Sequence, residues 1–153
     1  MDNISSRPPF VQFTAKTREW QIVCICLACI ALFAYTACSK LMDHERFQIG
    51  LSDVKLIGSH SVYLSWLVPA TELIVVTLMI IPATYRKGLF AFILLMGTFT
   101  CYIIGILIWA KELPCRCGGA IERLSWTQHV WFNLAFIVMA IYALLLSKNN
   151  NVI

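Results

Sequence analysis

The chain has 153 residues, of which 59% are hydrophobic and only 13% are charged, whereas about a quarter of the residues in a soluble domain are charged. The deficit of charged residues is concentrated in a few long apolar runs. This pattern excludes a soluble domain and indicates that the bilayer is the solvent. The net charge of +4 comes from short loops and tails, so it indicates topology and lipid-headgroup contact and no nucleic-acid partner.

Four runs are long and apolar enough to cross a bilayer, because a spanning helix needs about 20 mainly apolar residues. In chain order they cover residues 20–39, 64–81, 88–110 and 127–146. The first run is too long for a cleavable signal peptide and lacks a small-residue cleavage site, so we expect it to remain as an anchor. The sequence therefore predicts an all-α, integral membrane four-helix bundle that forms a single domain over residues 1–153.

Four spans put both termini on one side of the membrane, and Lys and Arg divide equally between the two sides. The short turn between the second and third spans packs Arg86 and Lys87 against a membrane end, where positive charge has most influence on orientation. We therefore expect cytoplasmic termini in the inner membrane of a bacterium, with loops 40–63 and 111–126 facing the periplasm. The first of these loops alternates charged and apolar residues, which favours short interfacial helices acting as a lid.

The second outward loop, residues 111–126, contains features of a sharp turn and of a helix start. Gly118 and Gly119 favour a turn within it. Ser125 is followed three residues later by Gln128, which fits a capping box opening the fourth helix.

This loop also holds the two cysteines best placed for chemistry, Cys115 and Cys117. In the expected orientation they face a compartment where disulfides persist, and Arg116 between them favours the thiolate. A bridge across one residue departs from relaxed geometry and is easily reduced, which is typical of catalytic disulfides. Four further cysteines lie inside predicted spans, where cysteine behaves as a small hydrophobic residue: Cys24, Cys26, Cys29 and Cys101.

Three interpretations of Cys115 and Cys117 remain open. They form a redox pair, or one of them forms a structural bridge to Cys38 at the outer end of the first helix. Alternatively, together with His129 they bind a soft ion such as Cu(I). Two thiolates and one imidazole are a thin ligand set, so we assign no metal site.

Trp126, His129 and Asn133 recur at helical spacing on one face of the fourth helix, on the same side of the membrane as the cysteines. There His129 would act as the base that takes a thiol proton. An interfacial belt of Trp126 and His129, with a buried, hydrogen-bonded Asn133, accounts for the pattern equally well.

Glu72 is an acidic residue inside the second predicted span. At a rise of about 1.5 Å per residue it lies roughly 12 Å from the outer end, with Cys101 at roughly 13 Å and Cys29 at about 15 Å, so we expect these three groups to share a layer. A charge at such depth costs about 2.5–3.5 kcal/mol on insertion scales, so Glu72 should face the interior, neutralised or paired. It is either a functional group or a helix-to-helix hydrogen bond beside Pro69.

Three segments resemble the MauE branch of the DoxX-like membrane proteins. They are "SKLMDHERF" after the first helix, "WLVPATEL" in the second, and "CRCGGAIERLSW" before the fourth. The third is the most specific, and the resemblance covers residues 20–146. The family residues present here are Lys40, Phe47, Pro69, Glu72, Cys115, Cys117 and Gly119. Gly118 stands where the family often has Phe.

The resemblance implies a four-helix membrane protein that supports disulfide formation or maturation of periplasmic proteins. In methylamine utilisation, the protein that is matured is a subunit of methylamine dehydrogenase. The plan is also similar to quinone-coupled thiol oxidoreductases of the vitamin K epoxide reductase type, which use C-x-x-C. The resulting hypothesis has Cys115 and Cys117 exchange electrons with a thioredoxin-fold or client protein. His129 assists proton transfer, and Glu72 faces a quinone.

Two other classes of protein remain as alternatives. One is a non-catalytic accessory subunit whose outward loops dock a client or enzyme and whose cysteines only shape the loop. The other is a carrier of small molecules or metals, for which the interior polar residues are too few to form a route: Glu72, Asn133, Thr98 and Thr100.

Overall fold

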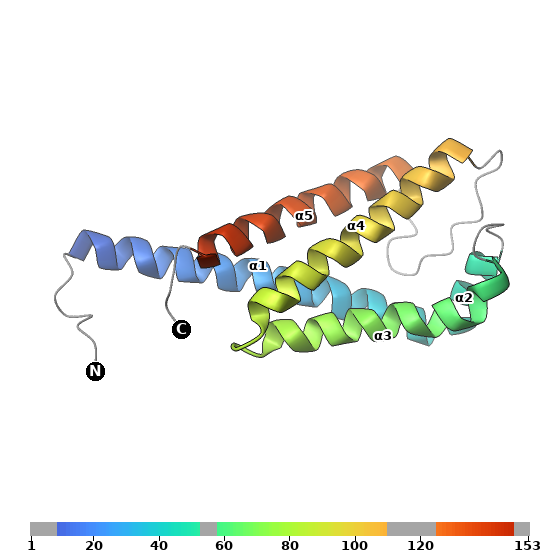
Figure 1. The fold of residues 1–153 in the computed structure, drawn as a ribbon, viewed down its shortest axis with the longest axis horizontal. Coiled ribbons are helices and arrows are strands. Elements are labelled where there is room, and N and C mark those ends of the chain that lie inside the picture. The colour runs from blue at the N-terminus through green and yellow to red at the C-terminus, as the bar shows by residue number, and fades with distance from the viewer. Residues whose placement is uncertain (1–8, 53–57, 110–124, 149–153) are drawn as a thin grey trace.

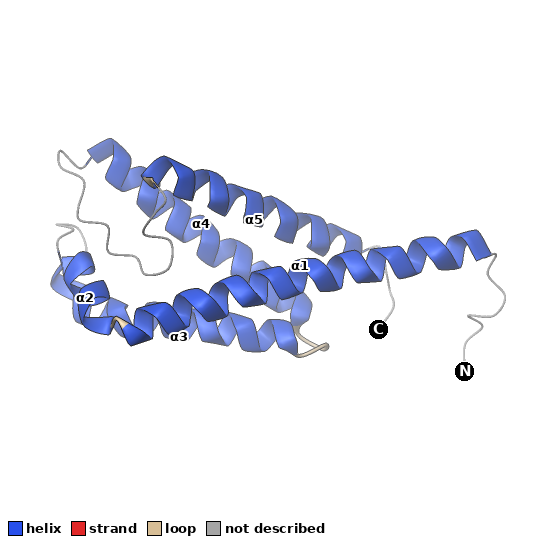
Figure 2. Ribbon diagram, turned by 180° about the vertical axis from the view of Figure 1, so that it is seen from behind, coloured by secondary structure: helices blue, strands red, loops and turns tan. Residues whose placement is uncertain are grey.

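The computed structural model describes residues 9–52, 58–109 and 125–148. These residues form helices joined by short turns and contain no strand (Figures 1 and 2). In chain order the elements are α1 (Pro9–Met42), α2 (His44–Ser52), the 3-10 turn η2 (Gly58–His60), α3 (Ser61–Ile80), α4 (Tyr85–Trp109) and α5 (Trp126–Lys148). The prediction of an all-α fold is confirmed.

Four of the helices, α1, α3, α4 and α5, are long and apolar enough to cross a membrane. They correspond to the four runs predicted to span the bilayer, so the chain is a multi-pass membrane bundle. The first helix is longer than its apolar run at both ends, because it begins at Pro9 and continues to Met42. Lys40 therefore belongs to the last turn of α1 and not, as predicted, to the outward loop.

The spanning helices run up and down in a closed arrangement in which each packs against two others. α1 lies against α3 and α5, and α4 also lies against α3 and α5. The diagonal between α1 and α4 is filled by aromatic stacking, since the rings of Phe33 and Phe92 have centroids 4.3 Å apart. Buried Ala140 and Ala143 allow α5 to approach the other helices closely, as small residues do between membrane helices.

The turn between α3 and α4 is short and tightly bonded. The hydroxyl of Thr84 donates to the carbonyl of Leu78 at 2.8 Å, and the backbone nitrogen of Thr84 donates to the carbonyl of Ile81 at 3.0 Å. Gly88, in the first turn of α4, lies so close to α3 that an added Cβ would be 2.8 Å from the backbone nitrogen of Met79. The absence of a side chain at Gly88 thus sets how closely the two helices meet.

The short helix α2 covers one end of the bundle, which we call the α2 end. Its first residue, His44, stacks on Trp66 of α3 with a centroid distance of 4.2 Å, and its Nε2 lies 3.4 Å from the hydroxyl of Ser65. The prediction of short helices between residues 40 and 63 is confirmed by α2 and η2, and their role as a lid stays a prediction.

The α2 end also receives the C-termini of α1 and α4 and the N-termini of α3 and α5 (Figure 1). At the start of α5, the backbone nitrogen of Ser125 donates to Oε1 of Gln128 at 2.8 Å, and the backbone nitrogen of Gln128 donates to the Ser125 hydroxyl at 3.3 Å. The predicted capping box is confirmed. Both helices that flank residues 110–124 thus have their adjoining ends at the α2 end.

Candidate functional site

A buried ion pair joins α1 to α3 near the α2 end. The Lys40 ammonium donates to Oε1 of Glu72, with Nζ 2.5 Å from the oxygen. Only 1% of the Glu72 side chain and 15% of the Lys40 side chain are exposed. The expectation that Glu72 faces the interior and is paired is therefore confirmed, and its partner is a residue that was predicted to lie in a loop.

Thr36 completes the polar part of the site. Its hydroxyl lies 3.2 Å from Oε1 of Glu72 and also 3.2 Å from the carbonyl oxygen of Phe33, so one proton is shared between two acceptors. The other carboxylate oxygen of Glu72, Oε2, is buried and has no hydrogen-bond partner among the residues that the structure describes. The two oxygens of one carboxylate thus have unequal surroundings.

Two aromatic rings flank the ammonium group of Lys40. Its nitrogen lies 5.8 Å from the ring centroid of Phe47 in α2 and 5.5 Å from that of Phe99 in α4. Both distances fall in the range where a cation is attracted to an aromatic ring. Residues from α1, α2, α3 and α4 thus converge on the ammonium group of Lys40. We call this set of residues the Lys40–Glu72 site, and it consists of Thr36, Lys40, Phe47, Glu72 and Phe99.

The direction of the side chains explains why these residues meet. Side chains of a helix lean towards its N-terminus, so Lys40, in the last turn of α1, leans into the bundle away from the α2 end. Glu72 leans towards the N-terminus of α3, which lies at the α2 end, so the two groups approach each other. Thr36 and Lys40 are four residues apart and therefore share one face of α1.

Pro69 lies one turn before Glu72 on α3 and is itself fully buried. Proline has no backbone N–H, so the helix lacks the hydrogen bond that residue 69 would donate to the carbonyl of Ser65. Ser65 is also the residue that faces His44 of α2. The interruption of the α3 hydrogen bonding thus lies between the contact with α2 and the ion pair with α1.

The predicted layer of Glu72, Cys29 and Cys101 is wrong. Glu72 bonds to residues 36 and 40 of α1, whereas Cys29 lies about two turns deeper in the hydrophobic cluster with Phe33 and Phe92. Cys101 is exposed on the outside of the bundle. The prediction failed because depth along a helix does not tell which face a residue occupies, and because the side chains of Lys40 and Glu72 span the difference in height.

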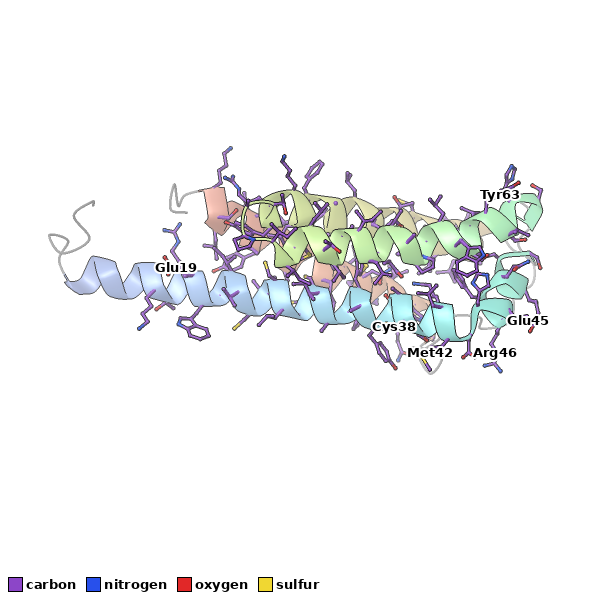
Figure 3. The ribbon with its side chains drawn as sticks, turned by 90° about the horizontal axis from the view of Figure 1, so that it is seen from below. Glu19, Cys38, Met42, Glu45, Arg46 and Tyr63 are labelled. Atoms are coloured by element: carbon purple, nitrogen blue, oxygen red, sulfur yellow. The ribbon has the colours of Figure 1, made fainter. Side chains whose placement is uncertain are left out.

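The cysteines predicted to carry the chemistry, Cys115 and Cys117, lie outside the described residues, as do Gly118 and Gly119. Cys38 is a free thiol on the exposed side of α1, close to its junction with α2 (Figure 3). No cluster of three or more His, Cys, Asp or Glu side chains suited to a metal ion occurs within the described ranges. The redox, bridging and Cu(I) interpretations therefore all remain predictions.

The predicted polar face of α5 is described in part. Asn133 is buried and His129 is half-buried, and the backbone nitrogen of His129 donates to the carbonyl of Ser125 at 3.0 Å. Trp126 is the first residue of α5, and its side chain lies outside the described part. A base at His129 thus remains a prediction.

Thr36 and Phe99 are members of the site that the sequence did not single out. Thr36 precedes Lys40 by one helical turn, so a sequence search for polar residues on the face of Lys40 would have found it. Phe99 is one of nine phenylalanines in the chain, and nothing in its local sequence separates it from the others. Only the packing of α4 across from α1 brings it to the ammonium group.

The fold and the site define a multi-pass membrane helical bundle with a buried, aromatic-flanked ion pair near one end. Residues 18–146 match the family model described as "Methylamine utilisation protein MauE". The chain belongs to this family. No curated protein and no solved structure matches it significantly, so the wider DoxX-like grouping stays a prediction.

Proposed function

We propose that this chain is a thiol–disulfide exchange protein of the bacterial inner membrane that supports disulfide formation in, and maturation of, periplasmic proteins. The observation that carries the proposal is the sequence Cys115-Arg116-Cys117 between α4 and α5, whose adjoining ends lie at the α2 end. Membership of the MauE family supports a role in methylamine utilisation. The resemblance of the C-x-C segment implies a subunit of methylamine dehydrogenase as the client.

The exchange is balanced in sulfur, electrons and protons. A thiolate of the client or of a thioredoxin-fold partner attacks the Cys115–Cys117 disulfide, forming a mixed disulfide and releasing one cysteine as a thiolate. The second thiolate of the partner then attacks the mixed disulfide, so the partner leaves oxidised and both cysteines are reduced. His129 accepts and returns a thiol proton during these steps. Regeneration of the disulfide requires an acceptor of two electrons and two protons, which a membrane quinone would supply.

Trapping of the mixed disulfide tests the proposal. In the Cys117→Ser variant, Cys115 attacks an oxidised partner but has no neighbouring thiol to release it, so a covalent adduct should accumulate and disappear on reduction. Replacing both cysteines by serine should abolish the adduct. The matched control is Cys38→Ser, which removes an exposed thiol of α1 and should leave the adducts unchanged. An adduct pattern that survives the double replacement would refute thiol exchange by this pair.

A non-catalytic docking subunit is the second candidate, and it is favoured by the apolar side chains exposed around the α2 end. These are Met42, Ile49, Val62, Tyr63 and Trp66, a composition suited to holding another membrane-associated protein or to lying at the lipid interface. Maleimide labelling with and without reductant separates the two functions. If the labelling of Cys115 and Cys117 changes with the redox state of the cell, thiol–disulfide exchange is supported. If their labelling never changes, the function as a docking subunit is supported.

A further inference from the structure

The carboxylate of Glu72 offers an acceptor that the described residues do not use. Oε1 accepts from Lys40 and Thr36, whereas Oε2 is buried without a partner in the described part of the chain. A buried polar atom is costly to leave without a hydrogen bond. A hydroxyl group beside Oε2 would remove this cost, so the site is suited to a ligand with a hydrogen-bond donor.

Lys40 offers donors directly beside this acceptor. An ammonium group has three N–H donors, and within the described residues its hydrogen bond goes to Glu72. Among the described residues, the rings of Phe47 and Phe99 also lie near the nitrogen, and such rings attract the cation but accept hydrogen bonds only weakly. A ligand oxygen next to Lys40 would therefore be both an acceptor for the ammonium and, when protonated, a donor to Oε2.

Charge and surroundings restrict the class of ligand. The pair of Lys40 and Glu72 is neutral overall, so an ionic ligand would leave a net charge between apolar helices, which is unfavourable. Phe47 and Phe99 favour a flat, aromatic or quinoid partner, since ring stacking adds to the burial of apolar surface. The ligand that fits is neutral and flat, with an oxygen that exists both as a carbonyl and as a hydroxyl.

We propose that the Lys40–Glu72 site binds the head group of a membrane quinone, an inference that rests on the proposed function because it locates the acceptor of the electrons from Cys115 and Cys117. The two thiols give two electrons and two protons to the quinone, so one disulfide and one quinol are formed. The quinone carbonyl accepts from Lys40. The quinol hydroxyl keeps this hydrogen bond and also donates to Oε2 of Glu72.

The reduced ligand thus makes one more hydrogen bond than the oxidised ligand. By thermodynamic linkage, a site that binds quinol more tightly than quinone raises the reduction potential of the bound quinone. Glu72 would therefore make the bound quinone a stronger oxidant of the cysteines, in addition to holding it. Tighter binding of quinol than of quinone is expected of a quinone site. A site that binds any lipid with a hydroxyl group would not require a quinoid ring.

The test is photolabelling of the purified full chain in lipid nanodiscs with an azido-ubiquinone analogue. Label should map to peptides of α1, α2, α3 or α4 that carry Lys40, Phe47, Glu72 or Phe99, and decylubiquinol should displace it at lower concentration than decylubiquinone. Label elsewhere in the chain overturns the proposal. So does equal displacement by dioleoylglycerol, which carries a hydroxyl but no quinoid ring.

Matched variants tie the label to the site. Lys40→Met combined with Glu72→Met removes the pair without leaving a lone charge and should weaken labelling about tenfold, as expected for the loss of charged hydrogen bonds. Thr36→Val should weaken it, whereas Thr98→Val, which removes a hydroxyl bonded only to its own helix among the described residues, should not. Phe99→Leu should weaken it, and Phe90→Leu on the exposed face of α4 should not. Equal labelling in the double variant and the unaltered chain overturns the proposal.

Failure of this inference is distinguishable from failure of the proposed function. The Cys117→Ser adduct needs no quinone, because the remaining Cys115 thiolate attacks a disulfide of the partner. An adduct that persists in the Lys40→Met, Glu72→Met background while labelling is unchanged refutes the quinone site and leaves thiol exchange intact. Labelling that depends on the pair, together with no adduct in any background, leaves the quinone site and refutes thiol exchange.

Discussion

The ion pair between Lys40 and Glu72 is the most consequential interaction at the scale of single residues. Each charge loses hydration when it enters the bundle, and the attraction between the two repays this loss only if further contacts support them. Thr36 supports the carboxylate, and the rings of Phe47 and Phe99 support the ammonium. The pair is therefore held by four helices, and removing either member leaves the other charge without its main partner.

Replacing both members of the pair should cost less stability than replacing either one alone. We expect Lys40→Met or Glu72→Met alone to cost about 3–5 kcal/mol, because an uncompensated charge stays buried. The combined variant should be more stable than either single variant, since two methionines leave no charge. Titration of the purified protein with sodium dodecyl sulfate in mixed micelles, followed by circular dichroism, measures the free energies of unfolding. Strictly additive losses would show that the two residues do not interact.

Glu72 could be predicted from the sequence, and its partner could not. An acid deep in an apolar run must be paired or neutralised, which identified Glu72 without any structure. Lys40 follows the end of an apolar run, so hydropathy assigned it to a loop. The helix continues to Met42 because backbone hydrogen bonding is indifferent to the polarity of the side chain. The partner thus became evident only from the extent of α1.

At the scale of elements, close contact between α3 and α4 depends on one glycine. We expect Gly88→Ala to destabilise the bundle by about 1–3 kcal/mol, because the new Cβ would meet the backbone nitrogen of Met79 at 2.8 Å and force the helices apart. Gly97→Ala is the matched control, since nothing lies within 4 Å of its added Cβ. It should be neutral or stabilising by up to about 1 kcal/mol, from helix propensity. Thermal unfolding of both variants in the same detergent checks the difference, and equal midpoints would contradict it.

The capping box of α5 is a second feature that can be tested at this scale. Ser125→Ala removes the hydroxyl that accepts from the backbone nitrogen of Gln128, which should cost about 1 kcal/mol. The loss should be local, with faster hydrogen exchange of the amides in the first turn of α5. Thr127→Ala, an exposed change in the same turn, should have little effect. Unchanged exchange in Ser125→Ala would mean that the start of α5 is held by other contacts.

The elements were predictable to different degrees for identifiable reasons. Apolar runs predicted all four spanning helices, because in a bilayer each backbone group must be bonded within its own helix. Ser125 and Gln128 predicted the start of α5, because capping depends on adjacent residues. The docking of α2 through His44 and Trp66 was not predicted, because it depends on the path of α3 and not on local sequence.

The whole molecule has two unlike ends. α1 has 34 residues, which is about 51 Å at 1.5 Å per residue, whereas the hydrocarbon core is about 30 Å thick. Its N-terminal part extends beyond the other helices (Figure 1), and Glu19 lies on this part, far from Glu45 and Arg46 at the α2 end (Figure 3). Arg86 and Lys87 open α4 at the end opposite α2. Positive charge next to a membrane end favours a cytoplasmic location of that end, here the end opposite α2.

The orientation of the whole molecule decides whether Cys115 and Cys117 meet an oxidising compartment. We expect the α2 end to face the periplasm, because Arg86 and Lys87 lie in a short turn where retention of positive charge in the cytoplasm acts most strongly. Two exposed positions report on the two ends, Ser59 in η2 and Lys148 at the end of α5. They lie on opposite sides of the membrane in any up-and-down arrangement of four spans, so one labelling experiment reads both.

The experiment places single reporter cysteines in a chain in which the exposed Cys24, Cys38 and Cys101 are replaced by serine. Cys115 and Cys117 are replaced by serine as well. Cys26 and Cys29 stay because they are buried and out of reach of a membrane-impermeant maleimide. In intact cells whose outer membrane is permeable to the reagent, Ser59→Cys should be labelled and Lys148→Cys should react only after lysis. The reverse pattern would put the C-x-C sequence on the cytoplasmic side, where thiols are kept reduced. Disulfide donation to periplasmic proteins would then be ruled out, although the fold and the ion pair would stay as described.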